Sequence, residues 1–244
     1  MAASSTPGPP PVDPTRPLAV DLPKRPTVLV LAGGDPPHPD LVLPEADLVV
    51  AADSGAHLAV AHGRQVDVLV GDLDSIAADA LAAIRRTDAQ VEDHHPDKDA
   101  TDLELALARA AAEGPGRLVL VGGHGGRLDH ALSVPGALAQ VAAPGRSVEA
   151  WLGSAQVLVK VDEVVLDARP GEQVSLLAWG GDAHGVSTEG LRWTLSEFTL
   201  EDGSTRGISN EALARPARVA VTGGTLVVVR PHALDPDADP GDVV

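Results

Sequence analysis

The segment DVLVGDLDSI, residues 67–76, joins a short apolar run to two aspartates that are separated by one residue. An uninterrupted apolar run of this length is typical of a strand buried on both faces of a parallel sheet. Side chains two residues apart on an extended strand point the same way. We therefore expect Asp72 and Asp74 to direct two like charges at one point, where the strand ends. Such a pair costs free energy unless it is protonated or neutralised, which raises the question of what neutralises it.

On both sides of this segment, apolar runs of the same kind alternate with helical patterns. The other four expected strands are 27–33, 47–53, 89–93 and 117–123. Ser54 and Ser75 are expected to cap the helices that follow them, and Thr101 with Glu104 forms a capping box. This order predicts a parallel-sheet, Rossmann-like three-layer α/β domain over residues 25–145, with the carboxyl ends of its strands at one edge.

The pattern changes after residue 145, where helical periodicity disappears. β-type runs separated by glycine-containing turns predict a small antiparallel all-β sandwich or barrel over residues 146–234. Residues 1–24 are rich in Pro, Ser and Thr and are expected to form a disordered leader. Residues 235–244 are expected to be an acidic tail.

Composition excludes several classes of function. The 244 residues include no cysteine, so disulfides, thiolate zinc sites and cysteine nucleophiles are excluded. A net charge of −17 argues against binding to nucleic acid or to an anionic membrane, although it allows a phosphorylated substrate that enters with a cation. The N-terminus does not resemble a signal peptide, and no stretch is long and apolar enough to span a bilayer, so we expect a soluble cytoplasmic protein.

Acidic side chains gather where the expected strands end. Asp53 ends one strand, Asp72 and Asp74 follow the next, and Asp102 opens a helix. Ligands of open parallel sheets bind outside the carboxyl ends of the strands. Mg²⁺ is held by a few carboxylates together with substrate phosphates. We therefore predict that Asp72, Asp74 and Asp102 hold Mg²⁺, which would neutralise the pair in 67–76.

A glycine-rich segment, VGGHGGRLDH at 121–130, offers a second feature of a phosphate site. Its glycines allow the backbone to approach a ligand closely, and Arg127 can donate two hydrogen bonds to a phosphate. It matches neither the P-loop nor the G-x-G-x-x-G motif, and LAGGDPP after the first strand does not match the latter either. The segment is a candidate phosphate site because it is expected at the same sheet edge as the carboxylates.

These motifs together resemble those of the thiamine pyrophosphokinase (thiamine diphosphokinase) family. The similar stretches follow the family's order and together cover most of 28–230. They are 51–76, PDKDATDLELAL at 96–107, GGHGGRLDHALS at 122–133, GVSTEGLRWTL at 185–195 and GISNE at 207–211. The resemblance implies transfer of a pyrophosphoryl group from ATP to the hydroxyl of thiamine, giving thiamine diphosphate and AMP. It also implies a homodimer in which thiamine lies between the α/β domain of one subunit and the β-domain of the other.

The resemblance also implies roles for individual residues. The expected catalytic residues are Asp72, Asp74, Asp102, Lys98 and Arg127. On chemical grounds a carboxylate near the hydroxyl accepts its proton, and Asp72 and Asp102 are both candidates. The ATP site is expected to contain Asp53, Ser54, Gly55, Asp97, Asp99, Thr101, Gly125, Gly126 and Arg127. Thiamine is expected to contact Ser187, Thr188, Trp193, Ser209 and Asn210.

Three departures from the family pattern bear on substrate contacts: Ser54 replaces a glycine, Leu73 a phenylalanine, and Val134 stands where an asparagine is common. Two other functions stay open at this stage. One is a pyrophosphokinase for another hydroxyalkyl heterocycle, such as a pterin, with the same carboxylates and a different β-domain pocket. The other is a regulator that binds thiamine or a nucleotide without turnover.

Overall fold

The computed structural model describes residues 25–235. The leader expected over 1–24 lies outside the described residues, as does the acidic tail beyond its first residue. None of the described helices is long and apolar enough to cross a membrane.

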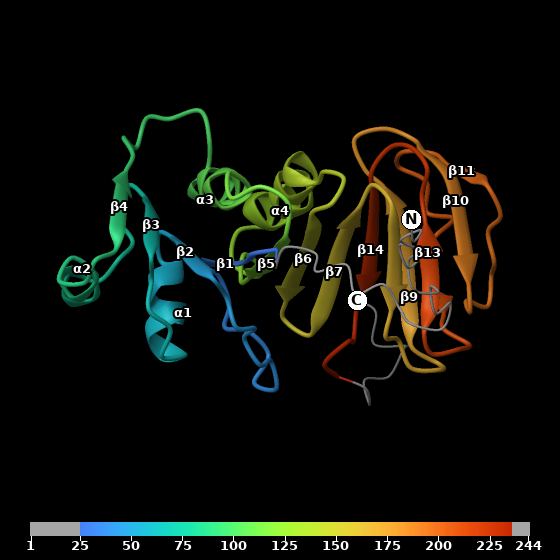
Figure 1. Ribbon diagram of the computed structural model, residues 1–244, viewed down its shortest axis with the longest axis horizontal. Coiled ribbons are helices and arrows are strands. Elements are labelled where there is room, and N and C mark those ends of the chain that lie inside the picture. Colours follow the sequence, from blue (N-terminus) through green and yellow to red (C-terminus); the bar gives the residue numbers. More distant parts are fainter. Residues whose placement is uncertain (1–24, 236–244) are drawn as a thin grey trace, which may run out of the picture.

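One ten-stranded sheet runs through the molecule in the order β12-β9-β14-β7-β6-β5-β1-β2-β3-β4 (Figure 1). The six strands from β6 to β4 in that order are parallel neighbours. They are β1 (Thr27–Ala32), β2 (Leu48–Ala52), β3 (Val68–Gly71), β4 (Gln90–Asp93), β5 (Arg117–Val121) and β6 (Ser147–Leu152). The five strands expected from the apolar runs are confirmed, and β1, β2, β3 and β5 are buried on both faces as their composition predicts.

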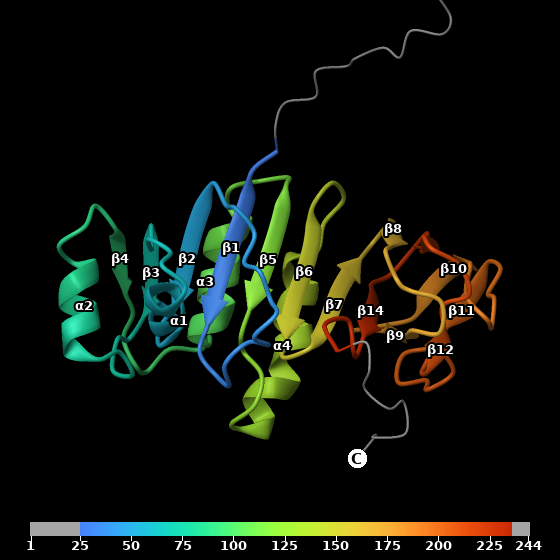
Figure 2. The same cartoon turned by 90° about the horizontal axis from the view of Figure 1, so that it is seen from below.

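Helices cover both faces of this parallel part (Figures 1 and 2). The helices α1 (Gly55–Ala61) and α2 (Ala78–Ile84) pack on one face, in a core with Leu29, Leu31 and Leu69. The helices α3 (Asp102–Ala111) and α4 (Leu128–Val141) pack on the other, in a core of valine, leucine and alanine. The predicted three-layer α/β architecture is therefore confirmed.

The capping predictions have mixed outcomes. The Oγ1 of Thr101 accepts a hydrogen bond from the backbone N–H of Glu104 at 3.2 Å, so the N-cap of α3 is confirmed. Ser54 occupies the N-cap position of α1 but makes no capping hydrogen bond. The prediction for Ser75 is wrong, because α2 begins after Ala77 and the Ser75 hydroxyl instead donates to the carboxylate of Asp53.

The C-terminal part is an antiparallel sandwich. The strands β7 (Ala155–Lys160), β14 (Leu226–Arg230), β9 (Gln173–Ala178) and β12 (Asn210–Glu211) extend the long sheet. A second sheet has the order β11 (Phe198–Leu200), β10 (Ala183–Glu189), β13 (Ala217–Ala220) and β8 (Glu163–Leu166). Both sheets contribute to one core, for example Leu176 and Val228 from the long sheet and Val186 and Leu200 from the short one. The predicted antiparallel β-domain is therefore confirmed.

The sheet is continuous across the position where the sequence pattern changes. The strand β6 pairs parallel with β5 on one side and antiparallel with β7 on the other. The parallel part therefore extends to Leu152, and the division between 145 and 146 stays a prediction.

Candidate active site

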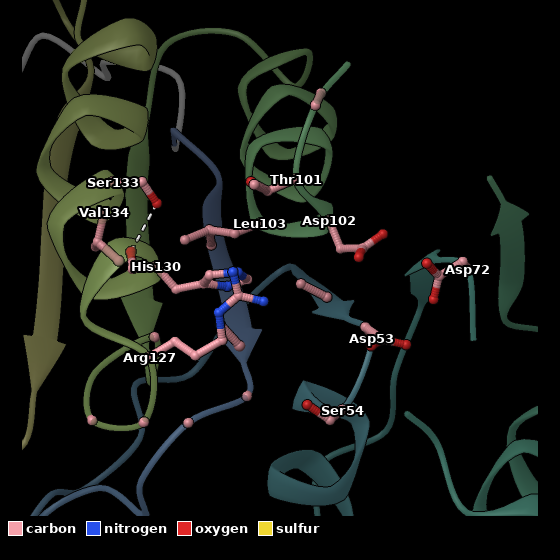
Figure 3. A pocket seen from close by; sticks show the side chains of 18 of the residues that line it. Asp53, Ser54, Asp72, Thr101, Asp102, Leu103, Arg127, His130, Ser133 and Val134 are labelled. Atoms are coloured by element: carbon pink, nitrogen blue, oxygen red, sulfur yellow. Dashed lines mark hydrogen bonds between the residues drawn. The ribbon is translucent and has the colours of Figure 1, made fainter. Parts of the chain in front are cut away.

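A cavity of about 620 Å³ lies at the carboxyl edge of the parallel sheet. It is bounded by the ends of β1 and β2, the turn after β3, the first residues of α3, and the β5–α4 loop with the start of α4. Figure 3 shows Asp53, Asp72 and Asp102 on one side of this cavity and Arg127 and His130 on the other. The edge predicted to hold a ligand is therefore hollowed.

Three carboxylates converge beside this cavity. Asp53, Asp72 and Asp74 each offer an oxygen, and these oxygens all lie within 4.8 Å of one another. Asp72 and Asp74 meet as expected, but not by strand alternation. The strand β3 ends at Gly71, Leu73 takes the left-handed conformation at φ 64°, and the Asp74 N–H donates to Asp72 Oδ1 at 3.4 Å. A tight turn thus brings the two carboxylates together.

Asp53 is the member of the group that the sequence analysis did not include among the metal ligands. It also has a left-handed backbone, at φ 46°, and its Oδ2 accepts the hydrogen bond from Ser75. Its Oδ1 is buried and has no hydrogen-bond partner among the described residues. Burial raises the pKa of the Asp53 carboxyl, and the charges of Asp102 and Asp72 raise it further.

Asp72 and Asp74 influence each other in opposite directions. The backbone hydrogen bond from Asp74 lowers the pKa of the Asp72 carboxyl, and nearby Lys98 lowers it as well. The side-chain hydrogen bond to Asp72 and its negative charge raise the pKa of Asp74. The turn therefore favours ionised Asp72 and disfavours a second negative charge next to it.

Lys98 bridges two carboxylates from different segments. Its Nζ lies 3.0 Å from Asp102 Oδ1 and 3.4 Å from Asp72 Oδ2. Burial alone would lower the pKa of Lys98, but the contacts with Asp102 and Asp72 raise it above its ordinary value. A Cβ on Gly71 would lie 3.1 Å from both Asp102 Oδ1 and Asp53 Cβ, so glycine leaves room for these acids to approach.

The acidic group fits a divalent cation. Hard cations such as Mg²⁺ take carboxylate oxygens, and the Asp53 Oδ1 without a partner is an available ligand atom. Asp102, which was predicted as a ligand, lies beside the group but is not one of its three members; its Oδ1 is 3.0 Å from Lys98 Nζ, and its role as a ligand stays a prediction.

The glycine-rich loop forms the opposite wall. The four glycines flanking His124 all have positive φ, from 62° to 94°, a conformation that favours glycine. Gly123 donates to the Gly33 carbonyl at 2.7 Å, and the His124 carbonyl accepts from Asp35 N–H at 2.9 Å. The loop after β1 therefore supports the loop after β5, and both contribute to the lining of the cavity.

Arg127 leads from this loop into α4, where it pairs with Asp129. Its Nη2 lies 2.6 Å from Asp129 Oδ2 and its Nε 3.2 Å from Asp129 Oδ1. This hydrogen bonding lowers the pKa of the Asp129 carboxyl to about 2. Both side chains are exposed, so the pair contributes little to stability, but its two hydrogen bonds direct the guanidinium beside the cavity.

Not every residue predicted for the ATP site reaches the cavity. Asp53, Ser54, Thr101, Gly125, Gly126 and Arg127 line it, as do Asp72, Lys98 and Asp102. Gly55, Asp97 and Asp99 do not, and Asp74 lies just outside. Lining residues that were not among the predicted site residues include Gly33, Gly34, Leu103, His130 and Ser133. The paired glycines of LAGGDPP were a usable signal, although that segment matches no dinucleotide motif.

A second cavity, of about 480 Å³, lies in the β-part. It is lined by Arg192, Trp193, Thr194, Leu195, Arg206, Gly207 and Asn210. Trp193 and Asn210 are thus together, whereas Ser187, Thr188 and Ser209 do not line this cavity. In the sheet order β12 is the first strand, whereas β1, β2 and β3 are in the other half, so the two cavities lie over different parts of the chain (Figure 2).

An acidic group, a lysine and a glycine-rich loop with an arginine at the carboxyl edge of a parallel sheet are typical of enzymes that bind a phosphorylated ligand with a divalent cation.

Comparison with known proteins identifies the family. The family model for the thiamin pyrophosphokinase catalytic domain matches residues 40–149, and that for the vitamin B1 binding domain matches residues 162–226. The thiamine pyrophosphokinase of Bacillus subtilis (strain 168) is 26% identical over 230 residues, which are 84% of this chain and 98% of the relative. Thiamine pyrophosphokinase 1 of Oryza sativa subsp. japonica is 26% identical over 245 residues, 86% of each chain.

A solved structure agrees with these matches. The crystal structure of thiamine pyrophosphokinase from Bacillus subtilis superimposes with a TM-score of 0.72 at 25% identity, covering 84% of this chain and 98% of that one. The chain belongs to the thiamin pyrophosphokinase family, a family of ATP-dependent kinases.

Proposed function

We propose that this protein transfers the pyrophosphoryl group of ATP to the hydroxyl of thiamine, giving thiamine diphosphate and AMP. In this reaction the thiamine oxygen forms a bond to the β-phosphorus, the bond from that phosphorus to the oxygen of AMP breaks, and a carboxylate of the site accepts the hydroxyl proton. The observation that carries the proposal is the convergence of Asp53, Asp72 and Asp74 at the edge of a cavity that also contains Lys98 and Arg127.

Phosphoryl-type transfer needs positioning and charge neutralisation more than covalent work by the protein. Asp53, Asp72 and Asp74 would hold Mg²⁺, which supplies positive charge to the oxygens of the triphosphate. Lys98 and Arg127 would add fixed positive charge from two sides, and the positive-φ glycines allow backbone N–H groups to approach the phosphates.

We further propose that thiamine binds in the cavity that contains Trp193. A cationic heterocycle is attracted to an indole face, and the charge of Arg192, which lies 5.9 Å from the centre of that ring, is offset by its pairing with Glu211. Because that cavity and the acidic one lie over different parts of a chain, a single active site would combine the α/β part of one subunit with the β-part of another. This supports the homodimer implied by the family resemblance. A cytoplasmic location remains a prediction from the sequence.

Incubation of the purified protein with Mg²⁺, ATP and thiamine tests the reaction. We expect AMP and thiamine diphosphate in equal amounts. Asp74→Asn should abolish turnover with little change in Tm, because Asp74 is exposed. The matched control is Asp88→Asn. Asp88 is an exposed aspartate at the amino end of β4, away from the carboxyl edge that holds the cavity, so this variant should keep full turnover.

Other outcomes select the alternatives. Formation of ADP and thiamine monophosphate would contradict pyrophosphoryl transfer. Turnover of a hydroxymethylpterin in place of thiamine would identify the related pyrophosphokinase, and binding of thiamine without AMP release would identify the regulator. The matched vitamin B1 binding domain favours thiamine over a pterin.

Subunit complementation tests the shared site. Asp74→Asn chains, which are inactive, and Trp193→Ala chains, assayed at a thiamine concentration far below their raised KM, are denatured together and refolded. If each site combines parts of two subunits, half of the randomly formed dimers are mixed and each contains one intact site, so about one quarter of wild-type activity returns. If each chain carried its own complete site, no activity would return.

A further inference from the structure

The cavity of the β-part presents an exposed tryptophan on a fixed backbone. The side chain of Trp193 is 58% exposed, and Arg192 lies 5.9 Å from its ring centre. Arg192 is itself held by Glu211 through two hydrogen bonds of 2.9 and 2.7 Å. An indole that is exposed to this degree gains little from packing, so its position depends on what holds its backbone.

Asn210 holds that backbone on both sides of the residue. Its side chain is 5% exposed. The Oδ1 accepts from the N–H of Trp193 at 3.1 Å and from the N–H of Glu211 at 2.8 Å, while Nδ2 donates to the Trp193 carbonyl at 2.8 Å. Both lone pairs of the amide oxygen are therefore used within the protein.

Two more of the residues predicted to contact thiamine act on the same segment, residues 193–197. Thr188 Oγ1 accepts from the Leu195 N–H at 2.9 Å, and the Thr188 N–H donates to the Leu195 carbonyl at 3.0 Å. Ser187 Oγ accepts from the N–H of Glu197 at 2.9 Å, where the backbone is left-handed at φ 49°. Alternate residues of the segment are thus each fixed by one polar side chain.

We infer that Asn210, with Thr188 and Ser187 in support, is a positioning residue that presents Trp193 to thiamine, rather than a direct ligand through its amide oxygen. The inference rests on the proposed function. A segment ordered before the ligand arrives does not lose conformational entropy on binding, so affinity depends on these hydrogen bonds even where they do not touch the ligand.

A double-mutant cycle distinguishes positioning from contact. The thiamine KM and kcat are measured for wild type, Asn210→Leu, Trp193→Ala and the double variant. We expect Asn210→Leu to raise KM about tenfold with kcat nearly unchanged, and to add less than about twofold in the Trp193→Ala background. Additive effects of the two substitutions would overturn the inference, because they would mean that Asn210 contacts thiamine independently of Trp193.

Thr188→Val gives a second test that does not depend on the folding of the leucine variant. Valine keeps the shape of threonine but cannot accept the hydrogen bond from Leu195 N–H, so KM should rise with kcat unchanged. The matched control is Thr205→Val, an exposed threonine between β11 and β12 whose side chain has no hydrogen-bond partner among the described residues. Equal KM values for Thr188→Val and wild type would refute the supporting role.

A ligand-free measurement separates this inference from the proposed function. In a chain with Trp151→Phe and Trp179→Phe, fluorescence reports only Trp193. Asn210→Leu should lower the anisotropy of that fluorescence, whether or not thiamine is the substrate. Unchanged anisotropy would overturn the positioning role, whereas failure of the wild type to bind thiamine would overturn the proposed function alone.

Discussion

Asp53→Asn is expected to stabilise the protein without metal while removing its response to Mg²⁺. The variant keeps the shape of the side chain and an oxygen that can accept from Ser75. It removes a charge that is partly buried and whose oxygen lies within 4.8 Å of one from Asp72. At that separation two like charges repel by about 0.9 kcal/mol at the dielectric constant of water and by about 3.5 kcal/mol at an effective value of 20. Because Asp72 borders solvent, we take the lower end, about 1 kcal/mol.

That free energy corresponds to a rise in Tm of about 2–4 °C for a chain of this size. The pH dependence follows from the raised pKa of Asp53. Above that pKa the carboxylate is charged and the cost is present in full, whereas protonation removes the cost as pH falls toward the ordinary value of 3.8. The difference in Tm between variant and wild type should therefore be largest near neutral pH and vanish near pH 3.

The assay is thermal melting in EDTA and in a series of Mg²⁺ concentrations, with Asp88→Asn as the control. A cation at about 100 times its Kd stabilises the wild type by about 2.7 kcal/mol, and Asp53→Asn should lose most of this gain along with turnover. A variant that melts below the wild type in EDTA, or that keeps the full response to Mg²⁺, would refute the assignment of Asp53 to the cation site.

Three further predictions follow from the same geometry. Gly55→Ala places a Cβ 2.0 Å from a backbone carbonyl oxygen of β1 and should lower the free energy of unfolding, measured in urea, by about 3 kcal/mol. Gly63→Ala, at φ 62° with no atom within 4 Å of the new Cβ, should lower it by about 1 kcal/mol. Equal costs would contradict the packing argument. Lys98→Met removes the cation between two carboxylates and should lower kcat at least about a hundredfold in steady-state assays; wild-type kcat would exclude Lys98 from the site. The hydrogen bond to Arg127 lowers the pKa of Asp129 to about 2, so the contribution of this pair to stability is present above pH 3.8 and is lost as pH falls toward 2. Asp129→Asn should therefore flatten the dependence of Tm on pH in that range. An unchanged slope would contradict the pairing.

The parallel part of the fold could be predicted because its signals are local. Continuous apolar runs mark strands buried on both faces, and the hydrogen bond from the Glu104 N–H to Thr101 matches the capping motif in the sequence. The partner of β6 could not be predicted in the same way. The sequence SVEAWL of β6 predicts a strand. Whether this strand joins the parallel sheet or an antiparallel one depends on residues far away in the sequence.

The acidic group shows a different limit. The sequence places Asp72 and Asp74 together through strand alternation, and they do meet, but through a left-handed Leu73. A leucine in this conformation has no signal in the sequence, because propensity disfavours it there. The approach of Asp53 depends on the register of β2 against β3, which local patterns do not specify.

The polar residues of the β-part show why a family motif does not define a ligand set. Ser187, Thr188 and Asn210 were expected to contact thiamine. In the structure each side chain accepts a hydrogen bond from a backbone N–H of the segment 193–197, a contact that the sequence does not reveal. A polar side chain whose hydrogen bonds are made within the protein can be essential for binding without touching the ligand. The roles of these three residues are therefore tested through Trp193, whose exposed ring lies in the cavity beside Arg192.

The two cavities also differ in how the chain maintains them. At the acidic edge the backbone is left-handed at Asp53 and Leu73, each at a cost of about 1 kcal/mol, and three carboxylates repel one another. These costs persist because β1, β2 and β3, on which the edge is built, are almost entirely buried. In the β-part Glu197 is left-handed as well, at φ 49°, but there the backbone N–H groups of residues 193, 195 and 197 are each satisfied by a polar side chain. Substitution of Asp53, the most buried of the three acids, should therefore raise stability and lower activity, whereas substitutions that loosen the β-part should lower thiamine affinity without any gain in stability.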